Sequence, residues 1–190
     1  SKYTFILMCF VAFPVLLEMD FLLSIWLKEV PEGSATFCRL MILCALLGCL
    51  GEGIPALVNA TGNIKNYQII IHSFTLLGLP ISFVCYKLGA TPFAILKVFC
   101  CISFLLAFIR LYLLKRIFDF DVRQFIEISF IKIGLISIPL LIFYILYNPA
   151  SFPIWGHILG IILSEIFLIA VIVLIGLDKE ERQLLASFVK

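Results

Sequence analysis

The chain has 190 residues, of which 63% are hydrophobic and 14% are charged, and its mean hydropathy is +1.18. A soluble domain carries about 25% charged residues, so this chain has too few polar side chains to cover a water-soluble globule. Its net charge of +2 is close to neutral and predicts no nucleic-acid partner. The composition excludes a soluble domain and predicts an all-α polytopic membrane protein.

A helix needs about 20 apolar residues to cross a hydrocarbon core about 30 Å thick. Stretches of this length are separated by polar segments with Pro or Gly, and they are residues 4–26, 35–58, 67–86, 93–114, 129–147 and 154–177. Each is continuously apolar, which favours helices over the strands of a membrane barrel, whose residues alternate in polarity. We predict six transmembrane helices within residues 1–177, followed by a polar tail at 178–190.

Lysine and arginine are distributed unevenly between the two ends of the predicted spans. With six spans both termini share one side, which collects Lys2, Lys65, Lys115, Arg116, Arg123, Lys179, Arg182 and Lys190. The opposite loops hold only Lys28 and Lys87. The positive-inside rule therefore predicts that both termini and the tail are cytoplasmic.

The longest predicted loop, residues 115–126, mixes basic residues with Phe and Ile. Two interpretations are open. The segment is either a helix lying along the cytoplasmic interface, with apolar residues buried and charges facing water, or an ordinary loop before a helix capped at Asp121.

Charged side chains inside a membrane are costly, so each one is a functional candidate. One face of the second span carries Ala45, Gly48, Glu52, Pro55 and Asn59 at helical spacing. Small residues let another helix approach closely, so Glu52 is expected to face protein or a watery cavity. Its carboxyl group either bonds to a neighbouring helix or takes part in a proton- or cation-coupled step.

The first span contains Glu18 and Asp20, with Pro14 one turn before Glu18. Pro14 removes a backbone hydrogen bond and is expected to kink the helix. On a continuous helix the two carboxylates are about 200° apart, which predicts that they do not face the same cavity. Asp20 is expected to reach the interface instead.

Glu165 lies in the middle of the last span, beside the small residues Gly156, Gly160 and Ser164, which predict a helix-packing face. His157 and His72 lie near span ends, and each either reaches the interface, which we favour, or serves as a functional histidine. Arg39 and Lys97 lie about a turn below the outer surface. They either extend to the lipid head groups or form a cationic cavity wall that attracts an anionic substrate.

No catalytic constellation is apparent in the sequence. It has no G-x-S-x-G elbow, no phosphate-cradling glycine loop and only two histidines, which are far apart. The seven cysteines lie in apolar runs without a C-x-x-C pair, which is typical of buried small side chains. We therefore predict no enzymatic activity, no metal site and no cofactor.

A series of short segments resembles a known transporter family. In chain order they are Trp26-Leu27, Val30-Pro31-Glu32, residues 59–68, Leu79-Pro80-Ile81-Ser82, Lys87-Leu88-Gly89, Arg110-Leu111, Lys115-Arg116 and residues 176–182. Their order resembles the C-terminal half of the O-antigen and capsular polysaccharide flippases of the multidrug/oligosaccharidyl-lipid/polysaccharide exporter superfamily. Asn63 stands where the family's alanine-threonine-glycine-lysine loop has lysine.

The resemblance implies one lobe of a two-lobe transporter in the bacterial inner membrane. It implies that undecaprenyl-pyrophosphate-linked oligosaccharide is flipped between leaflets, with a missing N-terminal six-helix lobe and membrane lipid as partners. Basic residues of the cavity would neutralise the pyrophosphate, and the candidates are Arg39, Lys97 and Arg110. Glu18, Glu52 and Glu165 are then coupling or packing carboxylates. Alternatives are a drug exporter of the same superfamily, a membrane enzyme acting on lipid-linked sugars, and a non-transporting membrane scaffold.

Overall fold

The structure is a computed structural model that describes residues 2–61, 64–118, 126–147, 153–177 and 181. The helices are α1 (Lys2–Leu17), α2 (Met19–Trp26), α3 (Ser34–Gly48), α4 (Gly53–Thr61), α5 (Ile64–Leu76), α6 (Gly78–Lys87), α7 (Ala94–Phe118), α9 (Lys132–Leu146) and α10 (Ile154–Val171). A 3₁₀ turn, η1 (Cys49–Gly51), joins α3 to α4, and π-helical turns η2 (Ile126–Ile131) and η4 (Ile172–Gly176) precede α9 and follow α10. The described residues contain no strand, which confirms the all-α fold class.

The protein is a multi-pass membrane protein. Its described part contains five continuous helical segments that are long and apolar enough to cross a membrane: Ser34–Ala60, Ile64–Lys87, Ala94–Arg116, Ser129–Leu146 and Ile154–Gly176. The first predicted span differs from expectation, because α1 and α2 are two helices whose axes diverge by 78°. Together they make a sixth crossing if the bent pair is one span.

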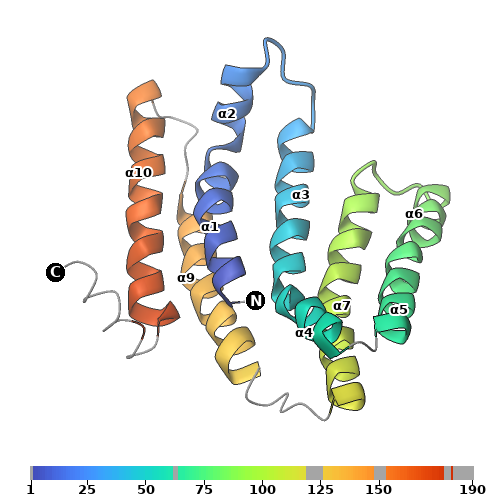
Figure 1. Ribbon diagram of the computed structural model, residues 1–190. Helices are drawn as coiled ribbons and strands as arrows, with labels where there is room; N and C mark the ends of the chain where they lie inside the picture. The colour runs from blue at the N-terminus through green and yellow to red at the C-terminus, as the bar shows by residue number, and fades with distance from the viewer. Residues whose placement is uncertain (1, 62–63, 119–125, 148–152, 178–180, 182–190) are drawn as a thin grey trace.

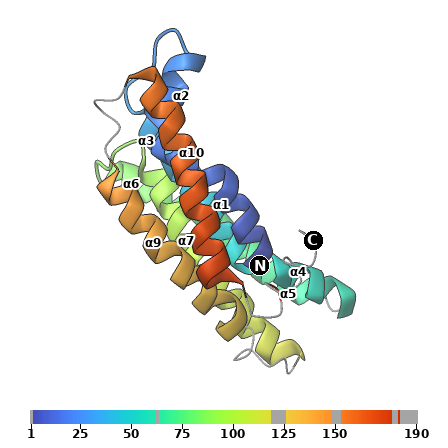
Figure 2. The same ribbon diagram turned by 90° about the vertical axis from the view of Figure 1, so that its left-hand side faces the viewer.

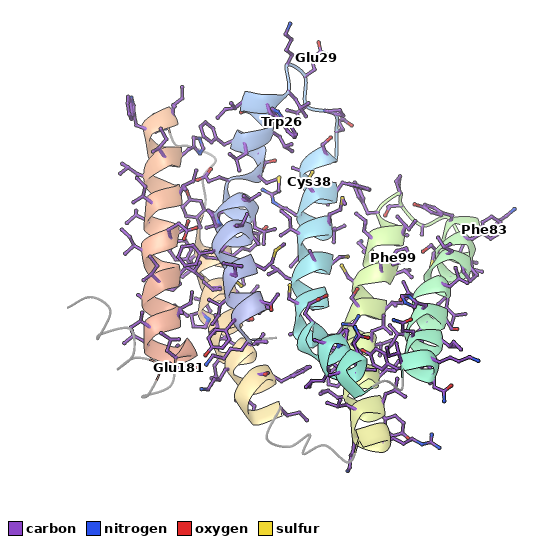
Figure 3. The ribbon with its side chains drawn as sticks, viewed as in Figure 1. Trp26, Glu29, Cys38, Phe83, Phe99 and Glu181 are labelled. Carbon is purple, nitrogen blue, oxygen red and sulfur yellow. The ribbon has the colours of Figure 1, made fainter. Side chains whose placement is uncertain are left out.

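The chain alternates direction from one span to the next, as six crossings require (Figure 1). The start of α1 and the ends of α4, α7 and α10 lie at the lower end of Figure 1, while the ends of α2 and α6 lie at the upper end. Glu181 accepts a hydrogen bond from Lys2 Nζ at 2.7 Å, which ties a residue beyond the last span to the start of α1 (Figure 3). The rest of the predicted tail lies outside the described residues.

The segment at residues 115–126 is only partly described. The predicted fourth span ended at residue 114, but α7 continues to Phe118, so the first part of the segment belongs to this helix. Residues 119–125 lie outside the described part, and both interpretations of the segment stay predictions.

The spans stand side by side in a row rather than in a closed bundle. Contacts run from α10 to α1, from α1 to α3, from α3 to α7 and from α7 to α5 and α6, while α9 packs behind α1. Figure 2 looks along this row from the α10 side. One buried cluster joins α1, α9 and α10 around Phe13, Ile136 and Leu168, and a second joins α4, α5 and α7 around Ile54, Ile71 and Leu114. Two regions of the row therefore have cores of their own.

Candidate functional site

The break between α1 and α2 is at Glu18, one turn after Pro14. Proline cannot donate a backbone hydrogen bond and crowds the preceding turn, which favours a kink in this part of the helix. The Glu18 N–H still bonds to the Pro14 carbonyl at 3.0 Å, and the chain changes direction immediately after it. The expected kink is therefore a full break, and a carboxylate occupies the corner.

Glu18 is buried, with 1% of its surface exposed, and both of its carboxylate oxygens have partners. The Tyr147 hydroxyl donates to Oε1. The Nδ1 atom of His157 lies 2.7 Å from Oε2. Tyr147 follows α9 directly and His157 is in the first turn of α10, so this one carboxylate connects three spans.

Gly160 provides the room for this contact. A Cβ atom at Gly160 would collide with the Tyr147 hydroxyl and would lie 3.0 Å from Glu18 Oε1. The predicted packing face of the last span is thus confirmed at Gly160, and Ser164 on the same face is fully buried. Gly48 differs: nothing lies within 4 Å of a Cβ built there, so the predicted packing of its face on another helix is wrong within the described chain.

Arg39 on α3 contacts both helices that meet at the break, α1 and α2. Its Nη2 lies 2.6 Å from Asp20 Oδ2, and its Nε donates to the Leu16 carbonyl at 3.3 Å. The carbonyls in the last turn of a helix have no intrahelical N–H donor. The Arg39 guanidinium supplies the missing donor for one of these carbonyls at the end of α1. Arg39 therefore does not extend freely to head groups, and Asp20 is ion-paired although 70% of its side chain is exposed.

These side chains line one cavity of about 700 Å³ at the break. Its lining is Leu17, Glu18, Asp20, Phe21, Ser24, Arg39, Tyr144, Ile145, Tyr147 and His157. The prediction that Glu18 and Asp20 face different sides is wrong. It assumed that both residues lie on one continuous helix, about 200° apart, but the helix is broken between them. His157 stays near the end of its span, where its ring stacks on Phe21 with 4.2 Å between the ring centroids and Nδ1 contacts Glu18, so the expected position at the interface stays a prediction.

The other candidate residues lie elsewhere. Lys97 on α7 is exposed, and Glu52, between η1 and α4, is exposed as well. Arg110 on α7 is part-buried against Gly51, and Glu165 is part-buried on α10. The buried atoms Arg110 Nε and Glu165 Oε2 have no hydrogen-bond partner in the described part of the chain. Of the proposed substrate and coupling residues, Arg39 and Glu18 line the cavity at the break, whereas Arg110 lies against Gly51, the neighbour of Glu52 in the sequence.

The cysteines and the possible metal ligands form no further site within the described residues. All seven cysteines are free; Cys9 is buried, Cys101 is exposed and the others are part-buried, so the expectation of burial holds only for Cys9. No group of three or more His, Cys, Asp or Glu side chains in this part of the chain has the geometry to hold a metal ion.

Tyr147 is the member of the site that sequence analysis missed. In the sequence it is only the last residue of the fifth predicted span, 129–147, and nothing there singles it out. Its position just before the connection to α10 gave one usable signal, since it must lie at the same membrane end as His157.

No family model, curated protein or solved structure matches this chain.

Proposed function

We propose that this chain is one six-helix lobe of a transporter that flips undecaprenyl-pyrophosphate-linked oligosaccharide across a bacterial inner membrane. The observation that carries the proposal is the first span, which is broken at a buried carboxylate bonded to two other spans. Discontinuous helices of this kind form the substrate and ion sites of many secondary transporters. The resemblance of the segments between Trp26 and Arg116 supports the choice of substrate.

A second lobe fits the uncovered face of α3 and α4. Along this face Ala45, Glu52 and Asn59 are exposed, and the space beside Gly48 is open. An intramembrane carboxylate among small residues is expensive to leave against lipid, so another protein element or a watery cavity is the better neighbour. Alternating access would then arise from rocking of the two lobes, with both termini of this lobe in the cytoplasm.

Glu18 is the best candidate for the coupling step. A carboxylate buried between spans exchanges a proton or a cation only when its surroundings rearrange, and here those surroundings belong to three different spans. Loss of the negative charge would weaken the contacts to Tyr147 and His157 and release the corner between α1 and α2. Occupancy of Glu18 would thereby be linked to the position of α2.

The charge of the cavity gives the drug-exporter alternative specific support. Its lining holds two carboxylates, Glu18 and Asp20, against one guanidinium, which is already paired with Asp20. A cationic small molecule suits this lining better than a pyrophosphate does. For the flippase proposal, the phosphate contacts would fall to cations outside this cavity, of which Arg110 and Lys97 are candidates.

The test is transport by the complete protein that contains this lobe, reconstituted in liposomes. We expect lipid-linked oligosaccharide to become accessible in the opposite leaflet, and Glu18→Gln to slow this by about tenfold or more. Glu29→Gln is the matched control, because Glu29 lies in the exposed turn after α2. Transport of organic cations without movement of the lipid-linked sugar would favour the exporter, and movement of neither would favour a scaffold.

A further inference from the structure

Two polar groups, one on α5 and one on α7, are buried without a hydrogen-bond partner. Within the residues that the structure describes, neither the Tyr67 hydroxyl nor the Arg110 Nε–H has a partner, and no carboxylate pairs with the Arg110 guanidinium. Tyr67 is 4% exposed. Arg110 precedes Arg116, the end of its span, by six residues, which is about 9 Å at 1.5 Å per residue. An unpaired charge at that depth is costly.

Both groups are donors that one carboxylate can satisfy. Arginine only donates, a phenol donates through its O–H, and a carboxylate has two oxygens that accept. Glu52 is the acidic residue beside this place, because Gly51 is buried against Arg110 and a Cβ built on it would lie 2.9 Å from Arg110 Cδ. Arg110 and Glu52 also both act electrostatically on the Tyr67 hydroxyl. The Glu52 side chain is nevertheless exposed and does not make this contact.

The turn just before Glu52 is the part of the second span that can rotate it. This turn, η1, is 3₁₀-helical, and the Glu52 N–H bonds to the Cys49 carbonyl at 3.4 Å, which is long for a backbone hydrogen bond. Gly48, Gly51 and Gly53 surround it, and glycine inside a helix weakens it. A 3₁₀ turn within a helix often marks a functional hinge.

Conversion of η1 to α-helix would turn Glu52 toward Arg110. A 3₁₀-helix advances about 120° per residue and an α-helix about 100°, so conversion of three residues turns α4 back by about 60°. Successive residues of an α-helix are about 100° apart, so this rotation carries Glu52 more than halfway to the direction in which Gly51 faces Arg110. Gly51 has no side chain to obstruct the guanidinium during the rotation.

We propose that the second span has two states and that Glu52 lies between Arg110 and Tyr67 in the second one. There its carboxylate accepts hydrogen bonds from the Arg110 guanidinium and the Tyr67 hydroxyl. The rotation is confined to α4, which lies beside α5 and α7, while α3 stays packed on α7 (Figure 1). The ion pair withdraws the negative charge from the uncovered face of α3 and α4, so this hinge controls the charge of that face.

Cross-linking of the full chain in liposomes tests whether Glu52 reaches position 110. In Arg110→Lys, dicyclohexylcarbodiimide should join the Glu52 carboxylate to the new amine as an amide, while the carbodiimide takes up the water and becomes a urea. Mass spectrometry of the digested protein detects the joined peptides. Phe108→Lys is the matched control, because Phe108 is exposed on α7 about 200° around the helix from Arg110. Absence of the amide in Arg110→Lys, or equal amounts in both variants, would overturn the proposal.

Spin-label distances test the rotation itself. With the native cysteines replaced, labels at Leu43 on α3 and Leu57 on α4, both exposed, should give two distances in liposomes. Arg110→Gln should remove the distance that belongs to the rotated α4, and exchange of the charges, Glu52→Arg with Arg110→Glu, should restore it. Lys97→Gln removes a cation near the opposite end of α7 and should leave both distances. A single distance in the unmodified chain, or two in Arg110→Gln, contradicts the hinge. Neither measurement requires transport, so this proposal and the proposed function can fail separately.

Discussion

At the scale of single residues, Glu18 shows how a membrane protein keeps a buried carboxylate. Burial of a charge in hydrocarbon is tolerated when partners satisfy it, and here a phenol and an imidazole do so from two other spans. Gly160 is a requirement of the same contact, because any side chain at that position occupies the place of the Tyr147 hydroxyl. The packing of these three spans against one another therefore depends on one glycine and three polar side chains.

Removal of one donor tests the carboxylate contact. Tyr147→Phe should lower the free energy of unfolding by about 1.5–3 kcal/mol, because a buried carboxylate oxygen loses its hydrogen bond. Thermal unfolding in detergent measures the loss. Tyr144→Phe is the control, since Tyr144 lines the same cavity without a hydrogen bond to Glu18, and it should change stability by less than about 0.5 kcal/mol. Equal melting of both variants would contradict the assigned role of Tyr147.

The close approach at Gly160 gives a second prediction. Gly160→Leu should destabilise the protein by about 1–3 kcal/mol or prevent folding, because the side chain collides with Tyr147. Gly48→Leu adds the same side chain where nothing lies within 4 Å and should fold normally. Fluorescence-detected size exclusion and thermal melting compare the two. A Gly160→Leu protein as stable as Gly48→Leu would show that α10 is not packed as described.

At the scale of helices, the direction of α2 is set by side-chain contacts to other spans, because α2 is not a continuation of α1. It is eight residues long, and its axis turns 78° from that of α1. Short helices are marginal without tertiary contacts, so the Arg39–Asp20 pair and the stack of Phe21 on His157 fix its direction. Loss of either contact should loosen α2 while the long helices stay in place.

Electron spin resonance distances test this dependence. With nitroxide labels at Ile25 on α2 and Met41 on α3, both exposed, the unmodified protein should give a narrow distance distribution. Arg39→Ala should broaden it, because α2 loses its link to α3. Lys97→Ala removes a cation that lies outside the cavity and should leave the distribution unchanged. A narrow distribution in Arg39→Ala would mean that the ion pair does not position α2.

At the scale of the whole molecule, the basic residues separate by membrane end. The start of α5, which carries Lys65, and the end of α7, which carries Lys115 and Arg116, lie at the lower end of Figure 1. The end of α2, which Lys28 follows, and the end of α6, which is Lys87, lie at the upper end. The alternation of the helices therefore preserves the asymmetry that the sequence predicted. The proposed cytoplasmic side is the lower end, by the positive-inside rule.

Cysteine labelling in intact cells tests this orientation. A cysteine at Lys65 should react only from the cytoplasm, and one at Glu32 only from outside, because these residues flank opposite ends of α3 and α4. Glu32 is a better site than Gly33, whose φ of +83° and contact with Phe93 disfavour any side chain. Labelling of position 65 from outside would reverse the proposed topology.

The sequence alone determined the fold class and the packing role of Gly160. It also determined the number of apolar crossings, if the broken pair α1 and α2 counts as one crossing. These follow from local quantities, namely hydropathy, residue size and helical periodicity, which require no knowledge of neighbours. The same quantities placed Arg39 and Glu18 among the functional candidates as intramembrane charges. They could not say which of these charges share a site.

Only the tertiary structure decided what Glu18 touches and how Asp20 is placed. The angle between Glu18 and Asp20 was reckoned on a continuous helix, and the break at that position invalidates it. Tyr147 and His157 lie more than 120 residues from Glu18 in the sequence and reach it because α9 and α10 pack beside α1. Such contacts depend on the relative placement of spans, and local periodicity describes each span only by itself.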